Sequence, residues 1–367
     1  MLLILTILAS AIRNTISSTM LQFITKKILY GLLVLTGVVV IVFFLFQGFG
    51  DPARLVLGQS GDAKTIKNIR KELGLDKPKW QQFLLYANDV SPIAIHSVSD
   101  IANKQLKGIF IGSNAAKFGI KFPYLRRSYQ TKKEVTAVLL EALPGTIILA
   151  LTAMLIATII GILLGVLAAV KQNTFWDTGS IFASVLGISA PSFFMGIMLA
   201  YLFGFVLSKY TGLQMTGSLY EIDPFTGKNL QIKNLILPAI TLGIRPLAII
   251  VQLTRSAMLD VLDQDYIRTA YAKGLGKQAV IFKHALRNAL NPVITAITGW
   301  FAELLAGAFF VEYIFGWKGI GKVTVDALEK LDFPVVMGSV LITATFFILV
   351  NILADVLYTV VDPRITK

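Results

Sequence analysis

Few residues in this 367-residue chain could perform catalysis or bind a metal ion. Cysteine is absent, which excludes disulfides, thiolate metal ligands and cysteine nucleophiles. Histidine is the usual general base and a common metal ligand, but the two histidines, His96 and His284, are far apart in the chain. We therefore expect no catalytic residue, no metal site and no cofactor bound by this chain itself.

One segment, Gly316-x-x-x-x-Gly321-Lys322, matches most of a phosphate-binding P-loop. The next residue is Val323, where a P-loop needs Ser or Thr to coordinate Mg²⁺. The segment also follows an apolar span, whereas a P-loop follows a β-strand. We therefore do not interpret it as a nucleotide site, and any ATP chemistry would have to come from another chain.

Arg245, Glu303 and Glu141 are ionisable residues in or next to apolar stretches, where such residues are functional candidates by default. Arg245 and Glu303 lie at comparable depth in two predicted spans, and Glu141 lies near the outer end of another. Arg245 and Glu303 could pair with each other, and Glu141 could sit at the water interface. Alternatively, the three residues could line a polar translocation path for a zwitterionic solute.

The composition requires a bilayer to position these residues. Hydrophobic residues make up 55% of the chain and charged residues 15%, against about 25% charged in soluble domains. The mean hydropathy is +0.71. The net charge of +13 is not spread along a water-facing surface, so nucleic acid is not an expected partner. The sequence predicts an all-α integral membrane protein.

Six transmembrane helices are predicted from apolar runs of about 20 residues or more. Four runs are free of charge, and two are interrupted by Arg245 or Glu303. The predicted spans are Ile28–Gly50, Ala142–Val170, Thr178–Ser208, Leu235–Met258, Pro292–Phe315 and Phe333–Ala354. Pro191 and Pro246 could kink two of these helices, and Gly161, Gly165 and Gly187 permit close helix approach.

The distribution of Lys and Arg in short loops predicts that both termini are cytoplasmic. Residues 1–27 then form an N-terminal extension, of which 1–19 are peripheral or derive from an upstream start codon. Residues 28–50 form the first span, 51–135 a large extracytoplasmic loop, 136–361 a five-helix core and 362–367 a cytoplasmic tail. Within the large loop we predict helices at Ala63–Leu73 and from Pro78 toward Ala87, and irregular chain over Asn88–Gln130.

The loop at residues 255–292 carries the clearest local signals. Asp263 and Asp265 could cap a helix at Tyr266–Lys273, and Gly274 fits a left-handed helix stop. A second helix at Lys277–Asn288 would place Phe282, Leu286 and Ala289 on one face and Lys283 and Arg287 on the other. A charged loop is usually a solvated linker, but two helices joined at a glycine favour a docking element.

These residues resemble a known family. Tyr266-Ile-Arg-Thr-Ala-Tyr-Ala-Lys-Gly-Leu275, followed by His284-Ala-Leu-Arg-Asn-Ala289, is similar to the coupling loop of ABC-importer permeases of the dipeptide and oligopeptide branch. The loop's usual Glu and Pro are missing, as in that branch. Further similar motifs are Gly50-Asp-Pro-Ala53, Ser189-Ala-Pro-Ser-Phe193, Leu253-Thr-Arg-Ser-Ala-Met258, Val311-Glu-Tyr-Ile-Phe-Gly-Trp317, Asp332-Phe-Pro-Val335 and Asp362-Pro-Arg-Ile365. The resemblance covers residues 20–367, apart from insertions at Asn88–Gln130 and about Tyr220–Gln231.

The resemblance implies a type I importer fold and a pore-forming subunit in the cytoplasmic membrane. Its partners would be a second homologous permease, two ATPase chains that bind ATP and Mg²⁺, and an extracytoplasmic solute-binding protein. The residues implied in ATPase coupling are Asp265, Tyr266, Ile267, Arg268, Thr269, Ala270, Lys273, Gly274 and Leu275. A secondary transporter or channel without an ATPase is the alternative; it would be expected to carry internal repeats and midplane carboxylates.

Overall fold

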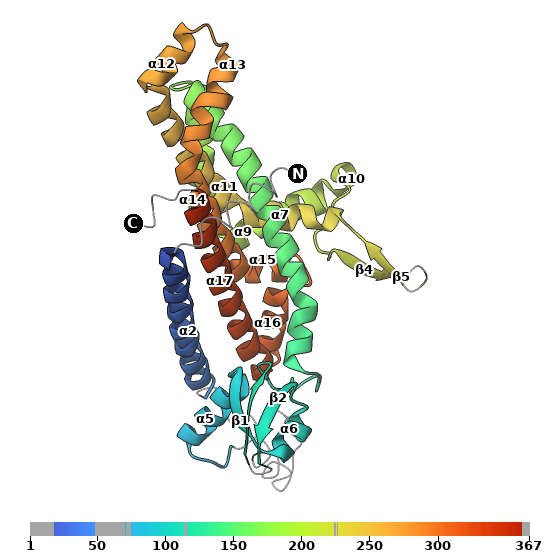
Figure 1. The fold of residues 1–367 in the computed structure, drawn as a ribbon. Helices are drawn as coiled ribbons and strands as arrows, with labels where there is room; N and C mark the ends of the chain where they lie inside the picture. Colours follow the sequence, from blue (N-terminus) through green and yellow to red (C-terminus); the bar gives the residue numbers. More distant parts are fainter. Residues whose placement is uncertain are drawn as a thin grey trace. The chain divides into compact units, whose positions relative to one another are not determined.

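The computed structural model describes residues 18–47, 70, 75–113, 116–223, 225 and 227–361. The chain is predominantly helical (Figure 1) and divides into two units. Unit 1 comprises residues 1–27, 144–322 and 346–367, and unit 2 comprises residues 28–143 and 323–345. The predictions for residues 1–17, for the helix Ala63–Leu73 and for the tail at 362–367 lie outside the described residues.

Four of the described helices are long and apolar enough to cross a bilayer. They are α2 (Ser18–Gln47), α7 (Val135–Val170), α11 (Lys233–Leu262) and α17 (Phe333–Val361). Each contains most of one predicted span and extends beyond at least one end of it, because helices continue past the hydrocarbon core. Pro246 lies inside α11, which nevertheless continues to Leu262.

The third predicted span, Thr178–Ser208, is broken at Pro191, where the sequence predicted a kink. The first part is α8 (Phe175–Ser189), and the second consists of α9 (Ser192–Leu199) and the π-helix η2 (Ala200–Val206). The helix axis bends by 108° between the two parts. Pro191 is the N-cap of α9. Proline lacks a backbone N–H and cannot continue the preceding helix, so the break falls where the sequence places this residue.

The fifth predicted span corresponds to α14 (Leu286–Gly307) and the short α15 (Phe309–Ile314). The helix ends at Gly307, short of the predicted end at Phe315. Because Asn291 and Glu303 lower its hydropathy, α14 is not among the described helices that qualify as spans by length and composition. By that measure the described chain has four spanning helices, or five if the bent pair counts as one span.

The predicted small-residue contacts in unit 1 are present. A Cβ atom at Gly161 would lie 2.7 Å from Ile250 Cγ2, and one at Gly165 would lie 2.5 Å from Thr254 Cβ. Gly187 is also close to α11, with its hypothetical Cβ 3.0 Å from Ile244 Cγ2. Such approach requires glycine, so α7 and α8 both pack directly on α11.

A buried polar cluster joins α7 to the start of α16 (Ile320–Glu329). The Thr146 hydroxyl donates to the buried Glu312 carboxylate at 2.7 Å and accepts from the Ile320 N–H at 2.8 Å. Beside it, the Trp317 indole N–H donates to the Gly145 carbonyl at 2.9 Å. Because every one of these groups is satisfied within the chain, the cluster fixes α15 and α16 against α7.

Unit 2 contains a small α/β region. The helix predicted from Pro78 toward Ala87 is confirmed, whereas the prediction of irregular chain over Asn88–Gln130 was wrong. The helix α5 (Lys79–Val90) is followed by β1 (Ile93–His96), α6 (Val98–Lys104), β2 (Gly108–Gly112) and β3 (Lys117–Lys121). The strands form an antiparallel sheet in the order β1-β3-β2. The strands have four or five residues each, and glycines or charged residues interrupt their apolar alternation, so their sequence signal is weak.

One face of this sheet carries exposed apolar side chains in two cross-strand rows. The register places Ile120 between Ile93 and Ile109, and Phe118 between Ile95 and Ile111. The opposite face buries Ala94, His96 and Lys121. The second predicted insertion, about Tyr220–Gln231, also has structure: β4 (Tyr220–Asp223) and β5 (Gly227–Leu230) form a hairpin after α10 (Ser208–Thr211).

Asp332 joins two segments of unit 2 that are far apart in the sequence. Its carboxylate accepts the Ser128 hydroxyl and the backbone N–H of Tyr129, the latter at 2.9 Å. The Gln130 N–H points at the same carboxylate from 3.5 Å. These contacts hold the chain that leads into α7 beside the turn that precedes α17.

Candidate functional site

The predicted docking loop forms a compact helical element at one end of α11 and α14 (Figure 1). It consists of α12 (Asp265–Ala272), α13 (Lys277–Ala279) and the π-helix η3 (Val280–Ala285), which continues into α14. The observed α12 lies within one residue of the predicted helix at both ends. The local signals therefore located this element correctly.

The start of α12 differs from the prediction. Gln264 is the N-cap, and no side chain makes a capping hydrogen bond, so the predicted caps Asp263 and Asp265 were wrong. Asp265 instead lies in the first turn, where the helix dipole favours a negative charge. It faces Arg268 at 3.5 Å, but both side chains are largely exposed, so this ion pair contributes little stability.

The end of α12 is a Schellman turn centred on Gly274, as the sequence predicts. Gly274 has a φ of +78°, and its N–H donates to the Tyr271 carbonyl at 2.9 Å. The N–H of Leu275 reaches back to the Ala270 carbonyl at 3.3 Å. This pair of bonds satisfies the last carbonyls of the helix and reverses the chain direction.

Two of the predicted coupling residues face inward. Ile267 is 2% exposed and Ala270 is 7% exposed. They belong to a buried cluster made by the ends of α7 and α11 and by η3, with members Val166, Ala169, Met258, Val280, Ile281, Ala285 and Ala289. The two residues therefore attach α12 to its own chain, which leaves the other side of the helix for a partner.

Two of the three residues predicted to share a face of the loop's second helix, Leu286 and Ala289, lie toward the buried cluster, and Phe282 does not. Ala289 is buried, Leu286 is partly buried, and Phe282 is 52% exposed, so the prediction for Phe282 was wrong. The reason is η3, because a π turn contains an extra residue and shifts the helix register. Val280 and Ile281 take the inward position instead. α12 is also held to α14 by a 2.8 Å hydrogen bond from the Asn288 amide to the Tyr266 hydroxyl.

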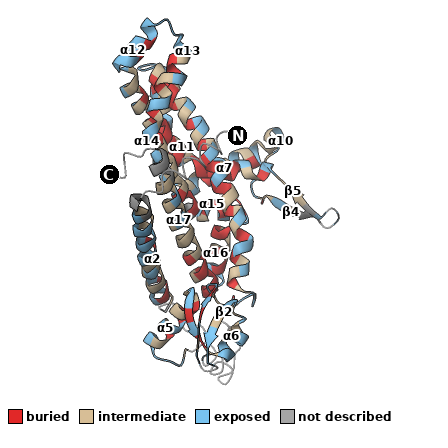
Figure 2. Cartoon of the chain, in the orientation of Figure 1, coloured by how far each residue is buried: buried red, intermediate tan, exposed pale blue. Residues whose placement is uncertain are grey.

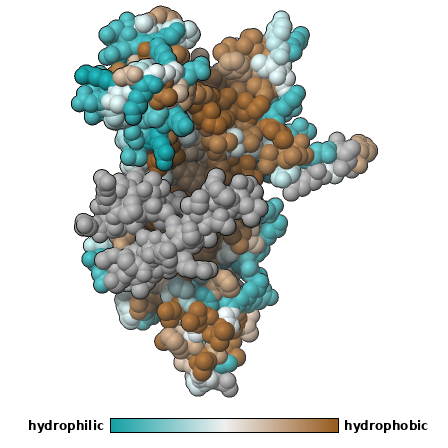
Figure 3. All heavy atoms as spheres, turned by 45° about the horizontal axis from the view of Figure 1, so that its top comes forward, coloured by the Kyte–Doolittle hydropathy of each residue, from teal (hydrophilic) through white to brown (hydrophobic). Residues whose placement is uncertain are grey.

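The outward side of α12 is polar with two exposed aromatic rings. Arg268, Thr269, Lys273 and Gly274 are exposed, and Tyr266 and Leu275 are each about two-fifths exposed. Figures 2 and 3 show exposed, hydrophilic residues gathered over this element. Tyr271, 44% exposed, belongs to the same surface but was missed. It lies between Ala270 and Ala272, and this local sequence gave no signal to separate it from a core residue.

An ion pair supports the helices beneath this element. Arg255 on α11 contacts Asp177 in the first turn of α8 with two bonds, Nε to Oδ1 at 2.5 Å and Nη2 to Oδ2 at 2.9 Å. Asp177 is buried, and its second oxygen also accepts the Asn173 N–H at 2.9 Å. A bidentate pair with a buried carboxylate is directional, so α8 and α11 are fixed together close to α12.

The residues predicted for a translocation path remain separate. Arg245 on α11 and Glu303 on α14 are both exposed, and the described chain contains no ion pair between them. Glu141 is exposed on α7. A cavity of about 350 Å³ lies among α7, α14 and α17, but residues such as Met154, Phe301 and Leu353 make its lining apolar. It contains none of the three charged residues.

The P-loop-like segment has its backbone donors occupied by the protein itself. The N–H of Lys322 donates to the Glu312 carboxylate at 3.2 Å, and a Cβ at Gly319 would lie 2.3 Å from the same group. A buried carboxylate therefore stands where a phosphate would have to bind. Among the described residues, no group of three His, Asp or Glu side chains could hold a metal ion.

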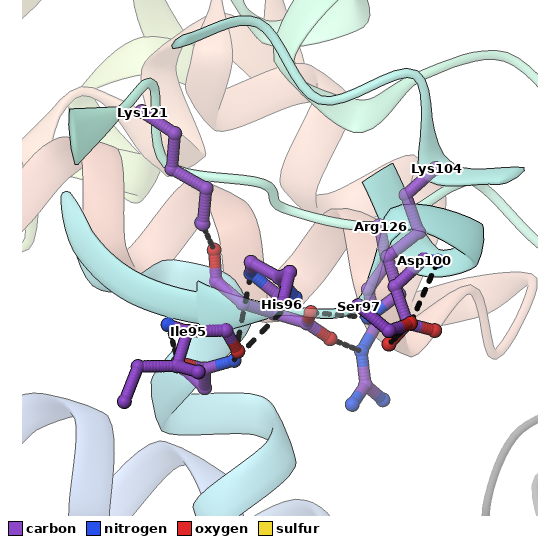
Figure 4. A network of polar contacts seen from close by, with 9 residues as sticks. Ile95, His96, Ser97, Asp100, Lys104, Lys121 and Arg126 are labelled. Carbon is purple, nitrogen blue, oxygen red and sulfur yellow. Dashed lines mark hydrogen bonds and ion pairs between the residues drawn. The ribbon is translucent and has the colours of Figure 1, made fainter. Parts of the chain in front are cut away.

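Unit 2 contains a second cluster of charged groups, shown in Figure 4. The buried Asp89 pairs with Lys104 and lies 3.5 Å from Arg126 Nε, while Lys121 donates to the Asp89 carbonyl. Burial lowers the pKa of Lys121 to about 8. Burial also lowers the pKa of His96, as do Lys104 and Lys121 nearby. The groups satisfy one another, so we interpret this cluster as a structural centre of the α/β region.

Comparison with known proteins identifies the family. Residues 161–367 match the family described as binding-protein-dependent transport system inner membrane component, and residues 20–97 match the corresponding N-terminal family. A di/tripeptide transport system permease protein, DppB, of Pseudomonas aeruginosa is 39% identical over 364 residues, covering 94% of this chain and 99% of that protein.

Two further relatives cover the same shares of both chains. The dipeptide transport system permease protein DppB of Escherichia coli K12 is 38% identical over 370 residues. The glutathione transport system permease protein GsiC of the same strain is 35% identical over 350 residues. With the helical membrane fold described above, these matches show that the chain belongs to the family of binding-protein-dependent transport system inner membrane components.

Proposed function

We propose that this chain is the pore-forming permease subunit of an ATP-driven importer of di- or oligopeptides or similar small solutes. The observation that carries the proposal is the geometry of α12. The helix is anchored on one side by Ile267 and Ala270 and presents Arg268, Thr269 and Lys273 outward. A solvated linker would need no such buried anchor. The similarity to peptide permeases over 94% of the chain supports the substrate class.

In this proposal α12 transmits ATPase movements to the membrane helices. The partner would contact the coupling surface, which consists of the exposed residues Asp265, Tyr266, Arg268, Thr269, Tyr271, Lys273, Gly274 and Leu275. Ile267 and Ala270 would pass the force to α7 and α11, because they pack on the ends of both helices. The bidentate Arg255–Asp177 pair would carry the same displacement into α8.

Other chains would supply the remaining parts of the transporter. ATP and Mg²⁺ would be bound by two separate ATPase chains, since the P-loop-like segment is filled by Glu312. A second, homologous permease would complete the pore, and an extracytoplasmic binding protein would deliver the solute. The chain would lie in the cytoplasmic membrane with both termini and the coupling surface on the cytoplasmic side.

The charged residues in the spans fit a polar path. A charge that faces lipid is costly, and Arg245 and Glu303 are exposed with no ion pair to any other described residue. They would therefore face the pore or the second permease. A cation and an anion at such positions suit the two ends of a zwitterionic peptide, with Glu141 nearer the entrance.

Co-purification combined with peptide uptake tests the proposal. The chain is expressed with candidate ATPases and a candidate second permease from the same organism, in cells that lack their own peptide permeases. We expect two ATPase chains to co-purify in mild detergent. The double variant R268E/K273E reverses two exposed charges on the coupling surface and should release the ATPases and abolish uptake. Lys209, exposed in α10, provides the matched control, because K209E makes the same type of charge change outside this surface.

The alternative functions give different results. A secondary transporter or channel would take up solute without ATPase chains, and R268E/K273E would behave like K209E. If the ATPases co-purify but peptides are not taken up, the coupling role stands and the substrate class is wrong. Normal uptake by R268E/K273E would refute the coupling role of α12.

A further inference from the structure

The helix α5 of unit 2 is attached by aromatic contacts to the end of the membrane helix α2 (Figure 1). The ring of Phe83 lies 5.4 Å from that of Phe43 and is stacked at 5.9 Å on that of Phe44, measured between centroids. Tyr86 is stacked on Phe43 at 5.6 Å. Four aromatic rings therefore hold α5 beside the last residues of α2, close to the level where the apolar span Gln22–Phe46 ends.

The two sides of α5 differ in a way that its position explains. One side buries Gln82, Tyr86 and Asp89 against unit 2. The other side exposes Trp80 and Leu84, which lie one helical turn apart and are 61% and 55% exposed. A large exposed tryptophan and leucine on one helix face are unfavourable in water, and nothing in the described chain covers them.

The exposed side of α5 continues the outer surface of α2. Ile41 and Phe44 near the end of α2 are 64% and 55% exposed, as expected for a helix surrounded by acyl chains. Phe44 is stacked on Phe83, which lies one turn from Trp80 on α5. The apolar surface therefore passes from the membrane helix to α5 through the Phe44–Phe83 contact without a polar break.

We infer that α5 is an interfacial helix that inserts Trp80 and Leu84 into the lipid headgroup region of the leaflet at the end of α2. Tryptophan concentrates at this depth because its ring is apolar and its N–H is polar. Amphipathic helices bury their apolar face about 5–10 Å into the boundary between headgroups and acyl chains. Lys77, exposed just before the helix, suits lipid phosphates. The inference requires only that α2 is embedded in a bilayer, and is independent of the transported solute.

Site-directed spin labelling can test this directly, because the natural chain has no cysteine to remove. Single cysteines replace Trp80 and Leu84, and the chain is co-purified with its partner subunits and reconstituted in nanodiscs of phosphatidylethanolamine and phosphatidylglycerol. Labels at Ile41 and at Ser99, exposed on α6, serve as lipid and water controls. The measured quantity is the accessibility of each label to oxygen, which enriches in lipid, relative to a nickel chelate, which stays in water.

We expect the oxygen-to-nickel ratio at positions 80 and 84 to exceed that at position 99 severalfold and to lie below or near that at position 41. A ratio equal to that at position 99 would place the helix in water and overturn the inference. Low accessibility to both reagents would mean that protein covers this face, which would also overturn it. The thermal stability of both variants should stay close to that of the natural chain, since Trp80 and Leu84 are each more than half exposed.

Discussion

Replacing Gly274 by valine tests whether the turn after α12 is set by backbone conformation alone. A Cβ at this position meets nothing within 4 Å, so the substitution creates no clash. Its cost comes from the φ of +78°, which an L-residue adopts at about 1–2 kcal/mol, with a β-branched residue at the upper end. Because 1.4 kcal/mol is a factor of ten in population, the native turn should become roughly 5- to 30-fold less favoured relative to alternative turns.

The neighbouring Gly276 provides a matched control. A Cβ at Gly276 would also meet nothing within 4 Å, but the φ of this residue is −63°, which valine adopts readily. G274V should therefore lower solute uptake and its coupling to ATP hydrolysis, while G276V should remain close to the natural chain. Asparagine, which tolerates the left-handed region, should give an intermediate effect at position 274.

Hydrogen exchange separates the turn from other causes of lost uptake. The N–H of Leu275, bonded to the Ala270 carbonyl, should exchange faster in G274V and at the natural rate in G276V. Uptake and exchange that are unchanged in G274V would refute our interpretation of the turn. Equal losses in G274V and G276V would show that side-chain bulk, and not backbone strain, matters here.

Three further substitutions test packing and electrostatics elsewhere. Gly165→Leu should lower the free energy of unfolding by about 1–3 kcal/mol or more, because a Cβ there would lie 2.8 Å from the Val251 carbonyl oxygen. Gly179→Leu is the control: a Cβ at Gly179 meets nothing within 4 Å, so this variant should melt like the natural chain. Asp332→Ala removes the acceptor of the Tyr129 N–H and should lower the free energy of unfolding by about 2–4 kcal/mol. The loss should appear as faster proteolysis of unit 2, and Asp332→Asn should lose less. The pKa of His96 is lower in the folded protein than the ordinary value of 6.5, so the unfolded chain binds a proton at this side chain more readily. The contribution of neutral His96 to folding stability is therefore fully present above about pH 6.5 and is lost as the pH falls below that value. Melting temperatures between pH 7.5 and 5.5 should therefore fall more steeply in the natural chain than in His96→Leu, and parallel curves would contradict this.

The sequence predicted the elements whose signals are local. The limits of α12, its stop at Gly274 and the break at Pro191 each follow from the backbone chemistry of one or two residues. Gly161 and Gly165 were expected at close helix contacts, and both lie against α11. Such features need no knowledge of the rest of the fold, because glycine and proline determine backbone geometry wherever they occur.

Features that depend on distant contacts were not predicted. The β1-β3-β2 sheet needs pairing between strands separated by α6, and its strands are too short to show a clear period. The direction of Phe282 depends on the π-helix η3, which a regular helical period cannot reveal. The hydroxyl groups that donate to Glu312 and Asp332 belong to Thr146 and Ser128, more than a hundred residues away in the chain, so no local pattern could have identified these contacts.

The π-helix η3 also has a consequence for insertions and deletions. A π turn holds one residue more than an α turn, so Val280 and Ala285 share an inward face although they are five residues apart. Deleting the exposed Phe282 should turn η3 into a regular α-helix, and Ala285 and all of α14 should then keep their present faces toward the rest of the protein. Deleting Arg287, inside α14, would instead rotate everything after it by about 100° relative to the loop. We expect deletion of Phe282 to preserve membrane insertion and uptake, and deletion of Arg287 to abolish uptake. The π-helix η3 is therefore the place where the coupling loop can lose a residue without a change in the helices that follow.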